Sequence, residues 1–589
     1  RQGQKKLVAD VYRTILRGKN LFIEAPTGVG KTISTIFPAV KAVGEGLADR
    51  IFYLTAKTIT ATVAKETFAL LEEQGYRAKV IQITAKEKLC LCEEMDCNPV
   101  NCPYAKGHFD RVNDAVFDLL QKSNLFTREE VLAQAKEYQV CPFEMSLDVA
   151  TWADNIVCDY NYVFDPNVYL KRFFQEGIKG DYIFLIDEAH NMVERSRQMY
   201  SAQIYKEDFL TVKRIMKEHS HSIEKALEKC NKILLGMKRE CENYTVYDTF
   251  GNMVFSFMRL MTLLDEFLQK ANEFPGKKDV MDFYFELRNF LNIYDLVDEH
   301  YVMYSELEAD GRFMLKLFCV DPSLNIQKRL DKGRSAVFFS ATFLPVNYYK
   351  SLLSTKKDNY AIYADSTFDS KKRLLAMATD VSTRYTRRSR SEYERIAGYI
   401  NAVVTQKTGN YMVFFPSYKM MNDVADIYCE KYADETELML QKNNMSEAER
   451  EEFLDRFSEE SDRTLVAFGI MGGIFGEGID LKNDRLIGAI VVGTGLPQIS
   501  NERTILKDYY DAENGCGFDY AFRYPGINKV LQAAGRVIRT TEDTGVILLL
   551  DERFWQREYD LLYPREWSDR KPCNIANVGK LVADFWEQI

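Results

Sequence analysis

The 589-residue chain has little of what several protein classes need. It has no apolar run of about 18 residues, the length that a membrane-spanning helix requires, and its charged start RQGQKKLVAD does not resemble a signal peptide. Its 31 glycines and 14 prolines are too few for a collagen-like or low-complexity chain. Positive charge is also in short supply, because 77 Lys and Arg face 87 Asp and Glu. The resulting net charge of −10 argues against a uniformly basic nucleic-acid binder but leaves room for a local basic channel.

Enough apolar sequence is present for several folded domains. Hydrophobic residues make up 46% of the chain, which excludes full disorder, and its length predicts about three to five domains. Short apolar runs alternate with helical patterns, and this rhythm predicts parallel sheets covered by helices on both faces. The runs form two sets, so we expect two α/β domains. The predicted strands are 21–24, 51–55, 80–84, 156–159, 182–187 and 336–340 in the first set, and 411–415, 465–468, 487–492 and 546–550 in the second.

Two stretches interrupt this alternation. Residues 86–145 hold five of the twelve cysteines, and residues 195–320 carry long amphipathic patterns that predict a helical insertion. The insertion could be a rigid spacer or could shape a substrate path. The cysteines are spaced Cys90-x6-Cys97-x4-Cys102-x38-Cys141, with Cys92 as a spare. Four thiolates could hold zinc or a [4Fe–4S] cluster, and free buried thiols are the plainer alternative.

A phosphate-binding loop follows the first strand. The sequence Ala25-Pro-Thr-Gly-Val-Gly-Lys-Thr32 lies between a predicted strand and a predicted helix, the context that a P-loop requires. Thr27, Gly28 and Gly30 would let backbone amides approach phosphate oxygens, Lys31 would reach the β- and γ-phosphates, and the Thr32 hydroxyl would bind Mg²⁺. A glycine-rich turn without a ligand is the alternative interpretation.

Paired acids follow another apolar strand. Asp187-Glu188-Ala189-His190 comes directly after residues 182–186, so both carboxylates are expected at the sheet edge where ligands bind. We expect Asp187 to hold Mg²⁺, Glu188 to deprotonate the attacking water, and His190 to sense the γ-phosphate. An acidic pair after a strand can also be an ordinary helix N-cap.

Eight motifs in this order resemble those of the XPD/DinG-type iron–sulfur helicases of superfamily 2, and the sequence is more similar in character to the bacterial DinG-like members. Besides the P-loop and the acidic pair, they are Arg1–Gln4, Leu54–Thr58, Ser340–Thr342, Val413–Ser417, Gly476–Asp480 and Gln532–Arg539. The resemblance implies that Gln4 reads adenine, that Asp480 lies between nucleotide and DNA, and that Gln532, Arg536 and Arg539 form an arginine-finger helix. From their i, i+3 spacing we expect Arg536 and Arg539 on one helix face, reaching the γ-phosphate when the cleft closes.

The resemblance also implies the domain plan. We expect a first RecA-like motor domain from residues 1–85, 146–194 and 321–345, an iron–sulfur domain at 86–145, a helical arch at 195–320, and a second motor domain at 346–589. The family places a [4Fe–4S] cluster in the cysteine stretch, which matches Cys90, Cys97, Cys102 and Cys141, with Cys92 as the bystander. An exchange of roles between Cys90 and Cys92 is the alternative.

A translocating motor must grip a nucleic-acid backbone without reading bases. The candidates are Thr55, Lys57 and Thr58 in the first domain, and Arg384 and Arg388 in the basic run 383–390 of the second. That run could also be a solvated charged turn. Tyr160 and Tyr162 could stack on bases, although we expect one of the two to pack in the core.

We therefore expect an intracellular, nucleoid-associated ATP-dependent DNA helicase that moves 5′→3′ on single strands and unwinds tailed duplexes in repair or recombination. ATP, Mg²⁺ and a [4Fe–4S] cluster are the expected cofactors. DNA is the expected partner of a monomer that works with repair or replication proteins and with no membrane. The alternatives are an ATPase switch or scaffold without unwinding, and the motor part of a larger nuclease–helicase whose nuclease precedes Arg1.

Overall fold

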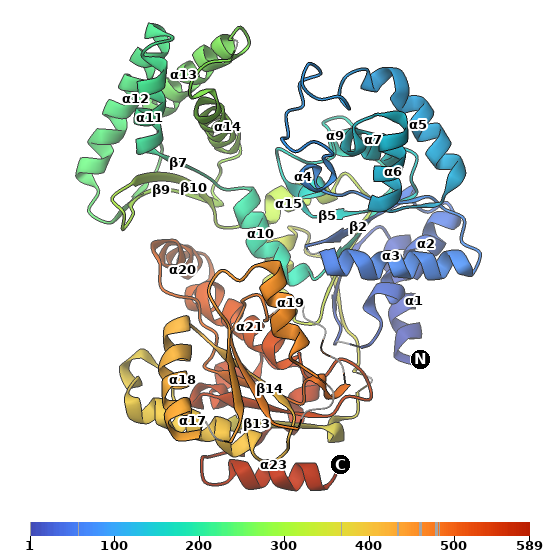
Figure 1. Ribbon diagram of the computed structural model, residues 1–589, viewed down its shortest axis with the longest axis vertical. Coiled ribbons are helices and arrows are strands. Elements are labelled where there is room, and N and C mark those ends of the chain that lie inside the picture. Colours follow the sequence, from blue (N-terminus) through green and yellow to red (C-terminus); the bar gives the residue numbers. More distant parts are fainter. Residues whose placement is uncertain are drawn as a thin grey trace.

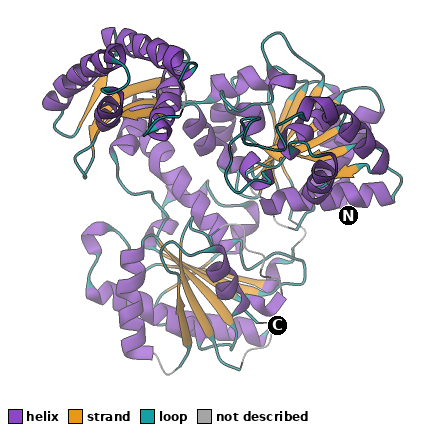
Figure 2. Cartoon of the chain, turned by 45° about the horizontal axis from the view of Figure 1, so that its top comes forward, coloured by secondary structure: helices purple, strands orange, loops and turns teal. Residues whose placement is uncertain are grey.

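The computed structural model describes residues 2–589 except residues 27, 57, 272, 367, 433–434, 459–461, 477–480 and 482. The described part holds three separate sheets, each with its own helices (Figures 1 and 2). Two of the sheets are parallel throughout, as the sequence predicts, and the third is antiparallel. No described helix combines the length and the apolar composition that crossing a bilayer requires.

The first lobe is built on an eight-stranded parallel sheet. Its strand order is β12 (Tyr360–Tyr363), β1 (Asn20–Glu24), β11 (Ser335–Ser340), β6 (Tyr182–Asp187), β2 (Arg50–Thr55), β5 (Asn155–Asp159), β3 (Val80–Gln82) and β4 (Leu125–Phe126). Ile23 faces the helices α1 (Gln2–Leu16) and α2 (Lys31–Gly44), whereas Phe22 packs on the opposite face, stacked on Phe338 at 4.5 Å between ring centres. Burial of both faces explains the near-continuous apolar runs in the sequence.

The other helices of the first lobe are mostly short. They are α3 (Thr58–Glu73), α8 (Asn161–Phe164), α9 (Lys171–Phe174), α10 (Met192–Met199), α15 (Ser323–Leu330) and α16 (Val346–Leu353). The lobe extends past residue 345, the predicted boundary, because β12 pairs with β1 in this sheet.

The cysteine insertion, residues 86–145, sits on the β3–β4 edge of the first sheet. Its helices are α4 (Lys86–Leu89), α5 (His108–Lys122), α6 (Arg128–Tyr138) and α7 (Pro142–Ala150). Helix α6 begins with a capping box between Thr127 and Glu130, which satisfies backbone groups at both positions. Strand β4 pairs with β3, so the insertion is continuous with the core of the first lobe.

The arch insertion, residues 195–320, stands apart from the cysteine insertion at the upper left of Figure 1. Its helices are α11 (Lys206–Met216), α12 (His221–Glu240), α13 (Asn252–Leu268) and α14 (Lys277–Tyr294). The sequence predicted a helical insertion, but the helices cover an antiparallel sheet, so the insertion is a mixed α/β unit. The sheet has the order β7 (Ala202–Tyr205), β10 (Phe313–Cys319), β9 (Tyr301–Leu307) and β8 (Tyr244–Tyr247).

The second lobe is a seven-stranded parallel sheet at the bottom of Figure 1. Its order is β15 (Glu437–Leu440), β16 (Leu465–Ile470), β14 (Asn410–Phe415), β17 (Gly488–Val492), β18 (Gly545–Leu550), β13 (Arg373–Ala378) and β19 (Lys571–Cys573). Its helices are α17 (Arg390–Val404), α18 (Tyr418–Tyr432), α19 (Glu447–Asp455), α20 (Asn501–Asn514), α21 (Tyr524–Ala534), α22 (Arg557–Asp560) and α23 (Val578–Glu587).

Helix α20 leaves the second lobe and joins the other parts together. Its buried residues Ile505, Leu506 and Tyr510 belong to the apolar core shared by the first lobe and the arch. Lys316 of the arch pairs with Glu502, and Arg503 pairs with Glu194 of α10. The two lobes and the arch therefore meet at one helix.

Candidate active site

The glycine-rich loop joins β1 to α2 and has the backbone that phosphate binding needs. Gly28 and Gly30 have φ of 84° and 75°, in the left-handed region that favours glycine. A Cβ at Gly28 would lie 3.0 Å from the carbonyl oxygen of Arg539, so the second lobe lies directly against this loop. Lys31 is the first residue of α2, and its Nζ donates to the Ala25 carbonyl at 3.2 Å. The Lys31 side chain therefore lies across the opening of the loop, bonded to the first residue of the loop.

Gln4 meets the same loop from α1. Its Nε2 donates to the carbonyl of Val29 at 3.1 Å, and a Cβ at Gly30 would collide with the Gln4 amide. The predicted adenine-reading residue is therefore beside the phosphate loop, and its reading of adenine stays a prediction. Thr27 and Asp480 lie outside the described residues.

The acidic pair lies at the carboxyl end of β6, between the loop and the second lobe. Asp187 accepts a hydrogen bond from the Tyr53 phenol at 2.6 Å, and the Thr32 side chain lies near the same phenol. Burial, reinforced by the neighbouring Glu188, raises the pKa of Asp187 above its usual range. Thr32 and Asp187 are thus brought together around one buried acid, an oxygen-donor set that suits Mg²⁺.

Glu188 has an unusual backbone and a crowded electrostatic setting. Its φ of 47° is one of three positive values among the described non-glycine residues, and such conformations concentrate at functional sites. Burial alone would raise the pKa of Glu188. The hydrogen bond to His190 and the charges of Lys31 and Arg536 outweigh this effect, so the pKa falls below its ordinary range. Lys31 of one lobe and Arg536 of the other therefore act on the same carboxylate.

His190 links the two lobes. Its Nδ1 lies 2.7 Å from Ser340 Oγ and 3.3 Å from Glu188 Oε2, and its Nε2 accepts from Gln532 Nε2 of the second lobe at 2.6 Å. With Nε2 as acceptor, the ring proton lies on Nδ1. Three of the predicted motifs, centred on His190, Ser340 and Gln532, thus meet in one hydrogen-bonded chain.

The two arginines do not share a helix face, and this prediction was wrong. Helix α21 ends at Ala534 with Gly535 as its C-cap, so Arg536 and Arg539 lie in the turn that follows. Glycine is a poor helix former, which explains the early end. Arg536 keeps its place because its Nε donates to the Gln532 carbonyl at 3.2 Å.

Tyr160 cannot stack on a base, contrary to the prediction that placed it at the nucleic acid. Its side chain is fully buried, and its hydroxyl donates to the carbonyls of Asp187 and Glu188. It therefore supports the backbone of the acidic pair from below. Sequence offered little warning, since the preceding strand predicts its position but not its direction.

A large cavity of about 1160 Å³ opens between the first lobe and the cysteine insertion. Thr55 and Tyr162 line it. Sequence reasoning missed the basic residues on its wall: Lys65, Lys86, Lys88, Arg128, Lys171 and Arg172. Only Lys86 and Lys88, close to Cys90, gave a signal in the sequence, because the other four come from separate segments.

The remaining nucleic-acid candidates are less concentrated. Arg384 and Arg388 lie in an exposed 3₁₀ turn of the second lobe, where Arg384 is 3.9 Å from Glu552 and Arg388 donates to the Thr383 carbonyl at 3.3 Å. Neither lines the large cavity. Lys57 and the Thr58 side chain lie outside the described residues.

The cysteine insertion forms a second candidate centre. Cys90, Cys92, Cys97, Cys102 and Cys141 line one cavity of about 350 Å³. The Sγ atoms of Cys92 and Cys102 are 3.8 Å apart, so the predicted bystander also faces this space. Five thiols around one cavity fit a thiolate-bound metal or cluster, and all twelve cysteines are free of disulfides.

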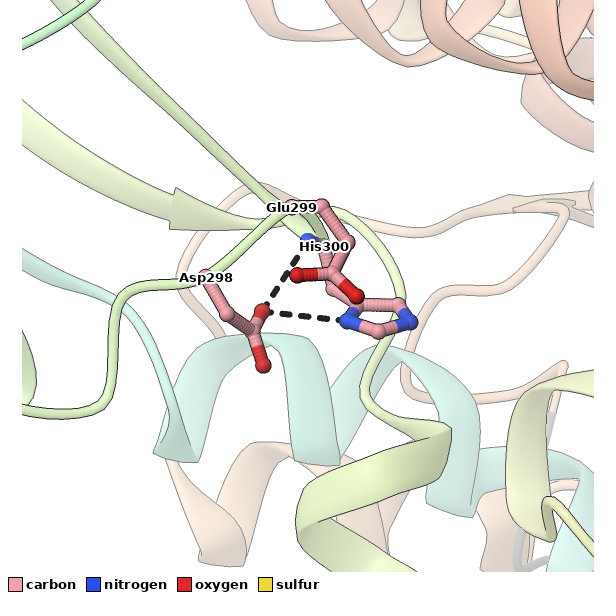
Figure 3. A group of neighbouring side chains, drawn as sticks. All are labelled: Asp298, Glu299 and His300. Carbon is pink, nitrogen blue, oxygen red and sulfur yellow. Dashed lines mark hydrogen bonds and ion pairs between the residues drawn. The ribbon is translucent and has the colours of Figure 1, made fainter.

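One further group of potential metal ligands, Asp298, Glu299 and His300, lies in the turn between α14 and β9 (Figure 3). Asp298 Oδ1 accepts from the backbone N–H of His300 at 3.0 Å and lies 3.0 Å from its Nδ1. The hydrogen bonds of the turn account for this cluster.

Comparison with known proteins agrees with the geometry. A parallel-sheet lobe with a P-loop and a strand-end acidic pair, facing a second lobe that supplies Gln and Arg, defines a two-lobed nucleoside triphosphatase. Residues 71–209 match the DEAD_2 family model and residues 400–570 match the helicase C-terminal domain model. The chain belongs to the XPD/DinG-type helicases of superfamily 2.

Individual relatives and structures cover nearly the whole chain. The ATP-dependent DNA helicase XPD of Sulfolobus acidocaldarius is 25% identical over 99% of this chain and 99% of its own length. The XPD/RAD3 helicase subunit of the general transcription and DNA repair factor IIH of Saccharomyces cerevisiae is 20% identical, covering 95% and 86%. A solved XPD helicase structure has a TM-score of 0.63 at 18% identity over 97% of this chain and 99% of that one, and S. tokodaii Xpd4 has 0.62 at 14% over 97% and 100%. These structures are similar in fold.

Proposed function

We propose that the chain is an ATP-driven DNA helicase that moves along single-stranded DNA and unwinds duplexes. The observation that carries this proposal is the chain Gln532–His190–Ser340, which joins the catalytic edge of the first lobe to the second lobe. A change at the γ-phosphate beside Glu188 would reach the second lobe through this chain. Cycles of closing and opening would then move the two lobes along a strand.

The chemistry is hydrolysis of the γ-phosphate. Lys31 and the loop amides bind the phosphates, and Thr32 with Asp187 would hold Mg²⁺, which neutralises phosphate charge. The ionised carboxylate of Glu188 would orient the attacking water and accept its proton. Arg536 supplies positive charge from the second lobe as charge develops on the transferred phosphoryl group.

The large cavity offers a path for the strand. Six basic side chains on its wall suit phosphate oxygens, and Tyr162 gives an aromatic surface for a base. Four acids, Glu87, Glu129, Glu144 and Asp159, share the wall and would limit where a backbone can lie. The acidic remainder of the molecule would repel DNA elsewhere.

For the cysteine insertion we propose a [4Fe–4S] cluster held by Cys90, Cys97, Cys102 and Cys141. The cluster would supply a rigid cross-link of this insertion beside the cavity. Iron and sulfide content and visible absorbance of the purified protein test the assignment, and stoichiometric zinc without iron would refute it. Comparing Cys90→Ser with Cys92→Ser identifies the first ligand, since only the ligand variant should lose iron.

Direction and biological role follow from the resemblance. We propose 5′→3′ movement, with repair or recombination intermediates as substrates. The test is strand displacement on duplexes with a 5′ or a 3′ tail, with Glu188→Gln as the folded, inactive control. Unwinding only from 5′ tails supports the proposal, whereas ATP hydrolysis without displacement of either substrate would favour a DNA-stimulated switch or scaffold.

A further inference from the structure

A cavity between the two lobes is lined by a buried acid, Glu24, that has no ion-pair partner among the described residues. It has a volume of about 330 Å³ and lies beside the segment that connects the two lobes after β12. Glu24 and Tyr363, the last residues of β1 and β12, line it from the first lobe. Leu561, Tyr563 and Arg565 line it from the second lobe.

Glu24 has no hydrogen-bond donor for its side chain among the described residues, although it is only 4% exposed. It directly precedes the phosphate loop and points away from α2, since Ile23 occupies the α2 face of the strand. The carboxylate therefore reaches only the small cavity that it lines, and this poor hydration favours either the protonated form or a partner of opposite charge. Burial raises the pKa of Glu24 to about 8, and the nearby Glu566 adds to this effect.

Arg565 is the cation that lines the same cavity as Glu24, and it has no acidic partner among the described residues. Its side chain is exposed, and its guanidinium lies over the Tyr363 ring, 4.6 Å from the centre. Within the described part of the chain it forms no ion pair, but its charge already lowers the pKa of Glu24. The acid next to it, Glu566, accepts the hydrogen bond of the Tyr363 hydroxyl.

We propose that Arg565 swings from Tyr363 to Glu24 when the lobes close around nucleotide, so that Glu24 is a positioning residue for the closed state. This inference rests on the proposed function in assuming a cleft that closes. A charge-assisted Arg–carboxylate pair in this cavity would give the ionised Glu24 the partner that it lacks here. The pair would form next to the phosphate loop. Nucleotide binding at the loop would then be coupled to the position of the segment that connects the lobes.

The proposal carries a pH signature. In this structure, where Arg565 lies over Tyr363, Glu24 is largely protonated at pH 7. Pairing with Arg565 requires the ionised form, so formation of the pair releases one proton to solvent. Closing is therefore favoured as pH rises towards 8. The groups that face Glu24 are Glu566 and Arg565 of the second lobe, Tyr363 of β12 and Tyr349 of α16. Burial raises the pKa of both tyrosines, so they stay neutral in this range.

The test measures the affinity for ADP–beryllium fluoride, with a single-stranded oligonucleotide present, by calorimetry at pH 6.5 and 8.5. Wild type should gain on the order of tenfold in affinity over this range beyond the gain of Glu24→Gln, because glutamine cannot ionise. Arg565→Gln should flatten the profile in the same way, and Arg565→Lys should restore part of it. Because binding is measured, the result does not depend on hydrolysis or unwinding.

The matched control is Glu566→Gln, which removes the neighbouring acid. It should leave the pH profile steep. A flat profile in Glu566→Gln with a steep one in Glu24→Gln would overturn the proposal by assigning the partner of Arg565 to Glu566. A wild-type profile equal to that of Glu24→Gln would overturn it outright, whereas an absence of ATPase activity in wild type would count against the proposed function alone. Arg565→Gln decides the matter if Glu24→Gln fails to fold.

Discussion

The two lobes share an architecture but divide the chemistry unequally. Each is a parallel sheet with helices on both faces, and each presents side chains at the edge where the lobes meet. The first lobe supplies Lys31, Asp187 and Glu188 from a loop and a strand end, on rigid elements. The second supplies Gln532 from α21 and Arg536 from the turn after it. In the proposed mechanism the first lobe therefore binds the nucleotide, and the second lobe acts on it across the interface.

The largest expected effect tests the binding half of this comparison. Lys31→Ala should abolish ATP hydrolysis and unwinding and weaken ATP binding at least a hundredfold, since the cation facing the β- and γ-phosphates is lost. Binding to a single-stranded oligonucleotide should survive. Calorimetry with ATP and fluorescence anisotropy with the oligonucleotide measure the two. Lys41→Ala, on the exposed side of the same helix and paired with Glu45, is the control that should behave as wild type. Normal unwinding by Lys31→Ala would end the motor assignment.

The next effect tests whether the second lobe contributes to hydrolysis and not to ATP binding. Arg536→Ala should lower kcat about a thousandfold while the Kd for ATP changes less than threefold, because the guanidinium acts on the transition state. Steady-state ATPase assays with a separate binding titration measure the split. Arg456→Ala, an exposed arginine of the same lobe paired with Glu437, serves as the control. A matching loss in ATP affinity would show that the second lobe holds the nucleotide too, and the proposed division would fail.

A smaller effect tests the link between the lobes. Gln532→Ala removes the donor to His190 Nε2, a bond worth about 1 kcal/mol between neutral groups, so kcat should fall about five- to tenfold. DNA stimulation of the ATPase should fall by more than the basal rate. Asn528→Ala removes a bond from the same helix to Tyr349 and should spare this stimulation. Equal behaviour of the two variants would reduce the link to ordinary packing between the lobes.

The smallest effect tests whether the first lobe also holds the strand. Lys65→Ala and Lys88→Ala should each weaken single-strand binding about threefold and reduce the slope of log K against log salt by about 0.7. Lys136→Ala, on a helix of the cysteine insertion away from the cavity, should leave the slope unchanged. Unchanged slopes in the first two variants would place the strand elsewhere.

Much of the fold was predictable because buried parallel strands leave a strong sequence signal. All ten predicted strands are present, and the comparisons support the two-domain α/β class. The short edge strands β4, β12, β15 and β19 carry only two to four residues and little burial pattern, so they were missed. The antiparallel strands β9 and β10 were absorbed into a helical assignment because their apolar residues are too dense to show a clear period.

The candidate site was predictable where a motif fixes the backbone. Gly28, Gly30, Lys31 and the acidic pair lie together because strand ends of a parallel sheet share one edge. The direction of a single side chain was not predictable in the same way. Tyr160 points under the acidic pair, and Arg536 lies past the end of its helix, because tertiary packing decides both. The basic wall of the large cavity could not be predicted from the sequence as a unit, because its residues come from segments about a hundred positions apart.

Strand β1, which carries the phosphate loop, pairs with β11 and β12 on its two sides. These neighbours begin at Ser335 and Tyr360, so about 310 residues must be synthesised after β1 before it has a neighbouring strand in its sheet. Both insertions must be synthesised in the meantime. The phosphate-binding loop therefore cannot reach its folded position in the nascent chain until the rest of its lobe has been synthesised.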